Sequence, residues 1–113
     1  MAYDYGLGNS TLPGDQSTAQ TAAGTTQGDA ATMVADFVSV ATVGDGSGVI
    51  LRASTPREIK VVCNAASANT LLVYPPSGGT INGATANLPL SLPAKHSAMF
   101  IPLSATAWAA IYG

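Results

Sequence analysis

The stretch "MVADFVSVATVGDGSGVILRA", residues 33–53, decides the fold class of this chain. Its first half is rich in β-branched residues, which favour strands. Residues 44–48, "GDGSG", supply turn residues, and a second apolar run follows from Val49. We interpret 44–48 as a hairpin turn between two strands. A calcium or phosphate loop is the alternative, but it needs either more acidic ligands than Asp45 or a Lys-Ser/Thr pair.

Short apolar runs with the same texture continue to the end of the chain. They are separated by turn residues every 8–12 positions, and no stretch has a helical period. The sequence therefore predicts an all-β fold, a small antiparallel β-sandwich or jelly-roll-like barrel of about seven or eight short strands with an extended N-terminal arm. The further strands are expected in 57–64, 70–74, 88–93, 96–103 and 106–113.

Two of these segments carry finer predictions. In "REIKVVCN" (57–64) apolar positions alternate, so we expect one face of the strand to be formed by Ile59, Val61 and Cys63 and the other by Lys60, Val62 and Asn64. Cys63, the single cysteine, is then a buried structural thiol, since nothing near it in sequence would lower its pKa.

Prolines and glycines predict an edge strand and a corner. "LPLSLP" (88–93) has three leucines on one face, and its prolines cannot donate ladder hydrogen bonds, so it is expected at a sheet edge. In "VYPPSGGTING" (73–83) the prolines end a strand, residues 77–79 reverse the chain, and Thr80-Ile81 pair briefly. Asn82-Gly83 then supply residues that tolerate a positive φ.

The composition limits the partners. The chain has 113 residues, which fits one domain, and only 9% of them are charged, against about 25% in an average protein. Its four Lys and Arg residues form no patch, which disfavours nucleic-acid binding, and no apolar run is long enough for a membrane span. Residues 1–10 lack the basic and apolar regions of a secretory signal, so we expect synthesis in a cytoplasm.

A surface of small neutral residues suits burial against other protein. We therefore expect a homo-oligomer. Residues 1–17 are predicted to form an extended arm and residues 18–113 a β-domain, with a possible first strand around 19–26. The arm either docks on a partner or is a disordered tail. If it docks, the candidate anchors are its aromatic and large aliphatic residues Tyr3, Tyr5, Leu7 and Leu12.

The reactive residues form no recognisable active site. His96 is the only histidine, whereas a metal site or a catalytic triad needs several convergent groups. Paired carboxylates would have to come from Asp36, Asp45 and Glu58, which carry no further signal. Trp108 and Tyr112 share one face of the last strand, where core packing is favoured over a sugar-binding platform. We expect no catalytic residues, no cofactor and no metal, and hence no enzyme.

The segments "VVCNAASANTLLVYPPSGGTING" (61–83) and "LPLSLPAKHSAMFIPLSATAWAAIYG" (88–113) resemble a β-domain common in virion proteins of tailed bacteriophages. The entry to that domain is similar to residues 24–51, so the resemblance covers roughly residues 24–113. The prolines of "LPLSLPAKH" depart from the pattern and leave the geometry of that edge open. The shared residues are turn and core residues, so they indicate a fold more firmly than a role.

The resemblance implies capsid decoration (cement) proteins, head fibres or tail-associated modules. A single domain with a short arm favours a decoration protein, which would bind the major capsid protein as a homotrimer on the outer surface of the virion. The alternative is a tail- or head-fibre-associated module that binds a carbohydrate or receptor through Tyr74, Trp108 or Tyr112. The resemblance implies no chemistry at any of these residues.

Overall fold

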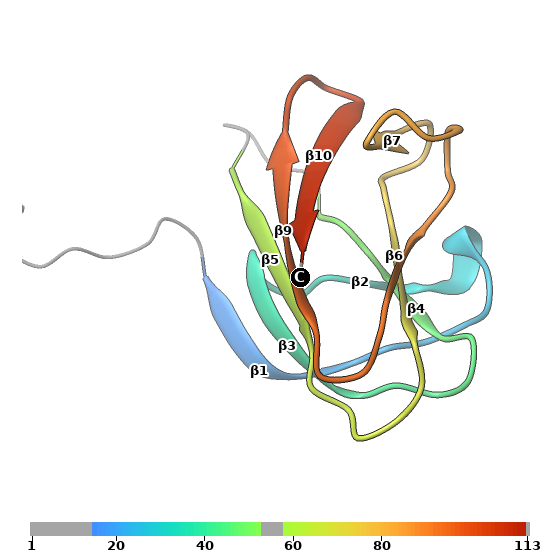
Figure 1. Cartoon of the computed structure of the whole chain (residues 1–113), viewed down its shortest axis with the longest axis vertical. Helices are drawn as coiled ribbons and strands as arrows, with labels where there is room; N and C mark the ends of the chain where they lie inside the picture. The colour runs from blue at the N-terminus through green and yellow to red at the C-terminus, as the bar shows by residue number, and fades with distance from the viewer. Residues whose placement is uncertain (1–14, 53–57, 113) are drawn as a thin grey trace, which may run out of the picture.

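The structure is a computed structural model that describes residues 15–52 and 58–112. These residues form ten strands and one short 3₁₀ helix, which confirms the all-β class (Figure 1). The elements are β1 (Gln16–Thr21), η1 (Gln27–Asp29), β2 (Ala31–Thr32), β3 (Phe37–Thr42), β4 (Gly48–Ile50), β5 (Lys60–Asn64), β6 (Leu71–Tyr74), β7 (Thr80–Ile81), β8 (Leu90–Leu92), β9 (Ser97–Pro102) and β10 (Ala107–Tyr112).

The first six strands alternate between two sheets. Strands β1, β3 and β5 lie side by side and parallel in a six-stranded sheet, whose order is β1-β3-β5-β9-β10-β7. Strands β2, β4 and β6 do the same in a four-stranded sheet with the order β2-β4-β6-β8. The chain thus winds three times around one core, with Gln16, Phe37 and Val61 in register on successive turns. This stacking is that of a short solenoid.

The last four strands close the winding in the opposite sense. Strand β8 pairs antiparallel with β6, β9 pairs antiparallel with β5, and β10 pairs antiparallel with β9. The two-residue strand β7 runs parallel to β10 at the edge of the sheet. Both sheets are therefore mixed, and the expected antiparallel jelly-roll arrangement is wrong for the first three turns.

The expected hairpin at residues 44–48 is also wrong. These residues do form a turn, closed by a hydrogen bond from the Ser47 amide to the Gly44 carbonyl, with Gly46 at a φ of 74°. They connect β3 in one sheet with β4 in the other, however, so the two strands do not pair. Gly48 begins β4 where a Cβ atom would lie 2.6 Å from the carbonyl oxygen of Leu72. The turn residues thus carry the chain across the core instead of back along the same sheet.

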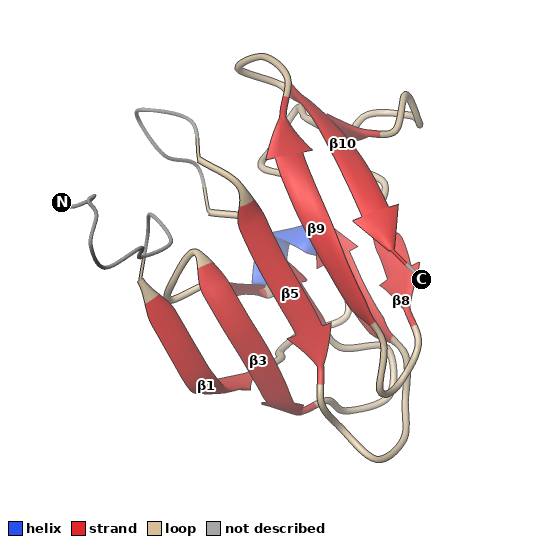
Figure 2. Cartoon of the chain, turned by 60° about the vertical axis from the view of Figure 1, so that its left-hand side comes forward, coloured by secondary structure: helices blue, strands red, loops and turns tan. Residues whose placement is uncertain are grey.

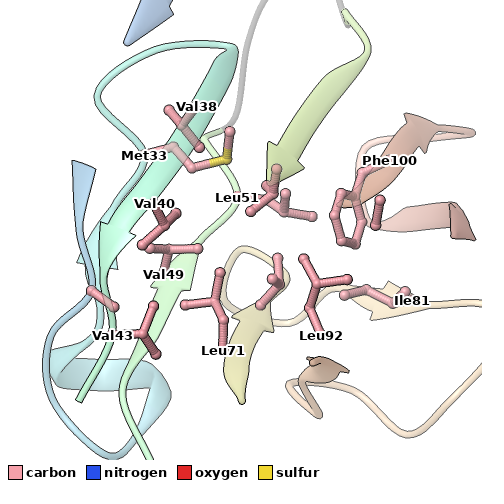
Figure 3. Close-up of a cluster of buried hydrophobic side chains, with 14 of the residues drawn as sticks. Met33, Val38, Val40, Val43, Val49, Leu51, Leu71, Ile81, Leu92 and Phe100 are labelled. Atoms are coloured by element: carbon pink, nitrogen blue, oxygen red, sulfur yellow. The ribbon is translucent and has the colours of Figure 1, made fainter. Parts of the chain in front are cut away.

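The two sheets face each other across a single hydrophobic core (Figure 3). The six-stranded sheet contributes Val40, Val62 and Phe100, and the four-stranded sheet contributes Val49, Leu71, Val73 and Leu92, all of them 0% exposed. Trp108 of β10 is 5% exposed and belongs to the same cluster, which confirms that its ring is a core aromatic.

The two turn and edge predictions of the C-terminal half are confirmed. Strand β6 ends at Tyr74, directly before Pro75, and Asn82 and Gly83 have φ values of 53° and 73°. Thr80-Ile81 form β7, which pairs with Ala107 and Trp108 of β10. Strand β8, within 88–93, is an edge strand that pairs only with β6 among the described residues.

The first described strand begins earlier than expected. Strand β1 is Gln16–Thr21, in place of the possible strand at 19–26. It therefore crosses the expected boundary between an arm of residues 1–17 and a domain of residues 18–113. The candidate anchors Tyr3, Tyr5, Leu7 and Leu12 lie outside the described residues.

Candidate interaction surface

Strand β5 buries the opposite face from the one that its apolar alternation predicts. Lys60 and Val62 are 0% exposed, as is Asn64, whereas Val61 and Cys63 are half-buried and point away from the core. Cys63 is thus not the buried structural thiol that the sequence predicts. A polar side chain can occupy the core face when hydrogen bonds satisfy it there, and hydrophobicity alone does not reveal those partners.

Asn64 shows how such a residue is accommodated. Its amide Nδ2 donates to the carbonyl oxygen of Leu92 at 2.9 Å and to that of Asn69 at 3.1 Å. Its Oδ1 accepts a hydrogen bond from the Ala66 amide at 3.2 Å. The buried amide therefore joins β5 to β8 and to the loop before β6, which stabilises the contact between the sheets.

A ladder of charges stacks at the end of the core where β1, β3 and β5 begin. Asp36 is 3% exposed, and its Oδ1 accepts hydrogen bonds from Lys60 Nζ at 2.7 Å and from Arg52 Nη2 at 2.9 Å. Arg52 also bridges to Asp15, whose Oδ1 accepts from the Asp36 amide at 2.9 Å. Asp15, Asp36 and Lys60 occupy equivalent positions, each directly before or at the start of its strand.

These contacts lower the pKa values of both aspartates. Burial raises the pKa of Asp36, but the hydrogen bonds from Lys60 and Arg52 outweigh it and hold the pKa below its ordinary value. The Asp36 amide and then the Arg52 guanidinium lower the pKa of Asp15. The ladder is thus a set of paired charges that fastens successive turns together, and no reactive group in it is left to do chemistry.

The outward side of the six-stranded sheet is the most unusual surface among the described residues (Figure 2). A sheet face in contact with water normally carries polar side chains. Here the outward positions of four adjacent strands carry no charge at all. They are Phe37, Ser39 and Ala41 of β3, Val61 and Cys63 of β5, Ser97, Met99 and Ile101 of β9, and Ala107, Ala109 and Ile111 of β10.

The largest of these side chains form one row across the sheet. Phe37 is in register with Val61, Val61 with Met99, and Met99 with Ile111. Met99 is 41% exposed and Ile111 is 63% exposed. We call these four residues the apolar row. A shallow hollow of about 470 Å³ lies against it, lined by Val61, Ser97, Ala98, Met99, Ile111 and Tyr112. The row is a surface suited to contact with an apolar partner.

Sequence analysis missed this row, although a signal for it exists. In "AMFI" and "AWAAI" apolar residues occupy consecutive positions, not alternate ones. Such runs are typical of strands that are covered on both faces. The same reasoning applies to "FVSVA" in β3, where the only polar residue is a serine.

The other candidate residues do not converge. Asp36 lies directly before β3 and Asp45 after it, so these two carboxylates lie at opposite ends of that strand, and Glu58 lies before β5. His96 is exposed next to the start of β9. Within residues 15–52 and 58–112 no group of three or more His, Cys, Asp or Glu side chains is placed to hold a metal ion.

The aromatic residues considered for sugar binding divide between core and surface. Tyr74 and Trp108 are each 5% exposed, whereas Tyr112 is 53% exposed. Trp108 and Tyr112 share the parity of β10, but Tyr112 stands at the end of the strand, where the core no longer covers it. These three rings therefore do not form one exposed platform.

The comparisons and the search for membrane helices add no assignment. No described helix is long and apolar enough to cross a bilayer. No protein family, curated protein or solved structure matches the chain significantly. The candidate site of this protein thus rests on its own geometry, namely the uncharged outward face of the six-stranded sheet and the charge ladder beside it.

Proposed function

We propose that this protein is a structural virion protein that binds the outer surface of a bacteriophage capsid and stabilises it, as decoration (cement) proteins do. The observation that carries the proposal is the uncharged, apolar outward face of β3, β5, β9 and β10, which suits contact with protein. The phage-virion resemblance of residues 24–113 supports the same role. A rigid double-sided core that offers contact surfaces fits a protein whose task is binding.

The proposal includes the partners and the assembly. The partner is the major capsid protein, and the chain acts as a homotrimer, made in the host cytoplasm and carried on the virion surface. An arm of 17 extended residues spans up to roughly 55–60 Å, enough to reach beyond its own domain. Three arms on one trimer bind with a raised effective concentration, which offsets the entropy lost when each arm orders.

The proposal assigns no catalytic residue, cofactor or metal. For the fold, we propose the description of a β-sandwich whose first three layers wind as a solenoid. The two sheets enclose one core, as in a sandwich, but the strand order differs from that of a jelly roll. The alternative function, a carbohydrate- or receptor-binding module, has weaker support. Of the three rings it would use, Tyr74 and Trp108 are in the core and only Tyr112 is exposed.

The test is a co-sedimentation assay with undecorated capsids. A variant that lacks residues 1–14 keeps all of β1, and Asp15 as well, so it should retain the melting temperature of the full-length protein. We expect this variant to lose most capsid binding. The matched variant Tyr112→Ala should bind capsids normally and decides the alternative function in a glycan-binding assay.

Two outcomes contradict the proposal in different ways. Equal capsid binding with and without residues 1–14 would move the interface from the arm to the sheet face or the loops. No binding of the full-length protein to any capsid surface, together with glycan binding that Tyr112→Ala removes, would replace decoration by the receptor-binding function.

A further inference from the structure

We propose that residues 1–14 fold back over the apolar row of their own chain, with Leu12 placed over Phe37 and Leu7 over Ile111. The proposal concerns the free protein and does not depend on capsid binding. It explains why a sheet of a chain with so few charges carries side chains such as Met99 and Ile111 on its outward face.

The position of β1 relative to the row is the first argument. Gln16 is in register with Phe37, so the row continues from Phe37 to the first residue of β1. Asp15 is the residue before it, and residues 1–14 therefore join the described domain at one end of the row. β1 is also the edge strand of the six-stranded sheet, so no further strand of the described chain stands between this segment and the outward face.

The sequence next to β1 favours a reversal toward that face. Pro13 and Gly14 occupy consecutive positions. Proline favours the second position of a type II turn and glycine the third, where φ is positive. A turn there, directly before Asp15, would direct the preceding residues back across the sheet.

The spacing of the leucines matches the length of the row. Phe37 and Ile111 are three strands apart, which is roughly 14 Å at about 4.8 Å per strand. Leu12 and Leu7 are five residues apart, which is about 17 Å in an extended chain at about 3.3 Å per residue. The segment can therefore place one leucine at each end of the row, and the second would reach the hollow beside Met99, Ile111 and Tyr112.

The size of the face favours a segment over a second copy of the whole domain. From β1 to β10 the face measures roughly 19 Å, and five residues along a strand add about 17 Å in the other direction. The product, on the order of 300 Å², is well below the roughly 800 Å² that each partner buries in a standard stable interface. An extended peptide needs only such a strip. This arrangement leaves Tyr3 and Tyr5 for an external partner.

The experiment measures how fast a thiol on the row reacts with a thiol reagent in the isolated protein. Cys63 is first replaced by serine, and Met99→Cys then puts one thiol in the middle of the row. The matched probe is Leu103→Cys in the same background, because Leu103 is 64% exposed and lies in the loop between β9 and β10, away from the row. We expect removal of residues 1–14 to accelerate labelling at position 99 several-fold and to leave labelling at position 103 unchanged.

A pair of substitutions in the full-length chain guards against unfolding of the shortened one. Leu7→Ser with Leu12→Ser should accelerate labelling at position 99 as the deletion does, and Tyr3→Ser with Tyr5→Ser should not. Labelling at position 99 that none of these changes affects overturns the proposal. Protection that increases with protein concentration also overturns it, because the occupant would then be a neighbouring copy.

Discussion

The substitution Asp36→Asn tests whether the charge ladder holds the turns of the core together. Asp36 Oδ1 lies 2.7 Å from Lys60 Nζ, and both side chains are buried, at 5% and 0% exposure. Removing one member of a buried ion pair costs about 3–5 kcal/mol, because the other charge stays in the core. The amide of asparagine still offers an oxygen to Lys60. We therefore expect a loss near the lower end, about 3 kcal/mol of unfolding free energy at pH 7.

The same substitution should change how stability depends on pH. The lowered pKa of Asp36 means that its contribution is complete above the ordinary value of 3.8 and is lost as the pH falls through the lower, folded value. Asparagine does not titrate. The unfolding free energy of the variant should thus fall less steeply below about pH 4 than that of the unchanged protein.

Urea unfolding followed by Trp108 fluorescence at pH 7 and pH 3 measures both effects. Asp15→Asn is the matched control, since it removes the exposed carboxylate that binds the same arginine, and it should leave the unfolding midpoint at pH 7 almost unchanged. A loss below about 1 kcal/mol for Asp36→Asn at pH 7 would refute the reasoning, because surface substitutions usually stay in that range.

Three further predictions concern packing and assembly. Trp108→Ala should destabilise the fold by about 3–5 kcal/mol in the same assay, as deletion of a buried large aromatic does, whereas the exposed Tyr112→Ala should change it by less than about 0.5 kcal/mol. Gly48→Ala should cost about 1–3 kcal/mol, because its Cβ would lie 2.6 Å from a backbone oxygen of β6, and a thermal melt of Gly28→Ala, with no contact closer than 3.9 Å, provides the comparison. Sedimentation equilibrium should give a trimer, and a monomer at every accessible concentration would exclude the proposed assembly.

The strand content of the fold could be predicted, but the connections between strands could not. β-branched runs such as 37–43 and turn residues such as Asn82-Gly83 act locally, so their meaning is visible in the sequence. The sheet that a strand joins depends on partners far along the chain. Residues 44–48 have the composition of a hairpin turn, yet they cross the core, because the neighbour of β3 is β5, a full turn later.

A weak internal repeat could have revealed the winding. Asp15 and Asp36 each stand directly before a strand, and their strands are in register 21 residues apart, from Gln16 to Phe37. The repeat is concealed because the third turn has Lys60 at the corresponding position, with opposite charge, and is longer. Recognising it requires the knowledge that these side chains interact, which only the structure supplies.

The faces of β5 could not be predicted for a related reason. Alternation assigns apolar residues to the core, and Val61 with Cys63 looked like the core face. Lys60 and Asn64 are buried instead, because Asp36 and the carbonyl oxygen of Leu92 satisfy their polar atoms. Hydrophobic patterns predict burial well only where both faces do not compete, and here the outward face is apolar too.

The return of the chain through β9 has a consequence for the order of folding. Each early turn closes over about two dozen residues, for example from Gln16 to Phe37, so winding proceeds through contacts between neighbouring stretches. Strand β9 must instead find β5 across a longer span, with Met99 opposite Val61. The added closure entropy is only about 0.5 kcal/mol, but non-local pairing slows folding. Until β9 arrives, β5 is a free edge in the half-formed chain, open to pairing with another molecule. The growing protein is therefore most exposed to misassembly in the interval after β5 has formed and before the ribosome has delivered residues 97–102.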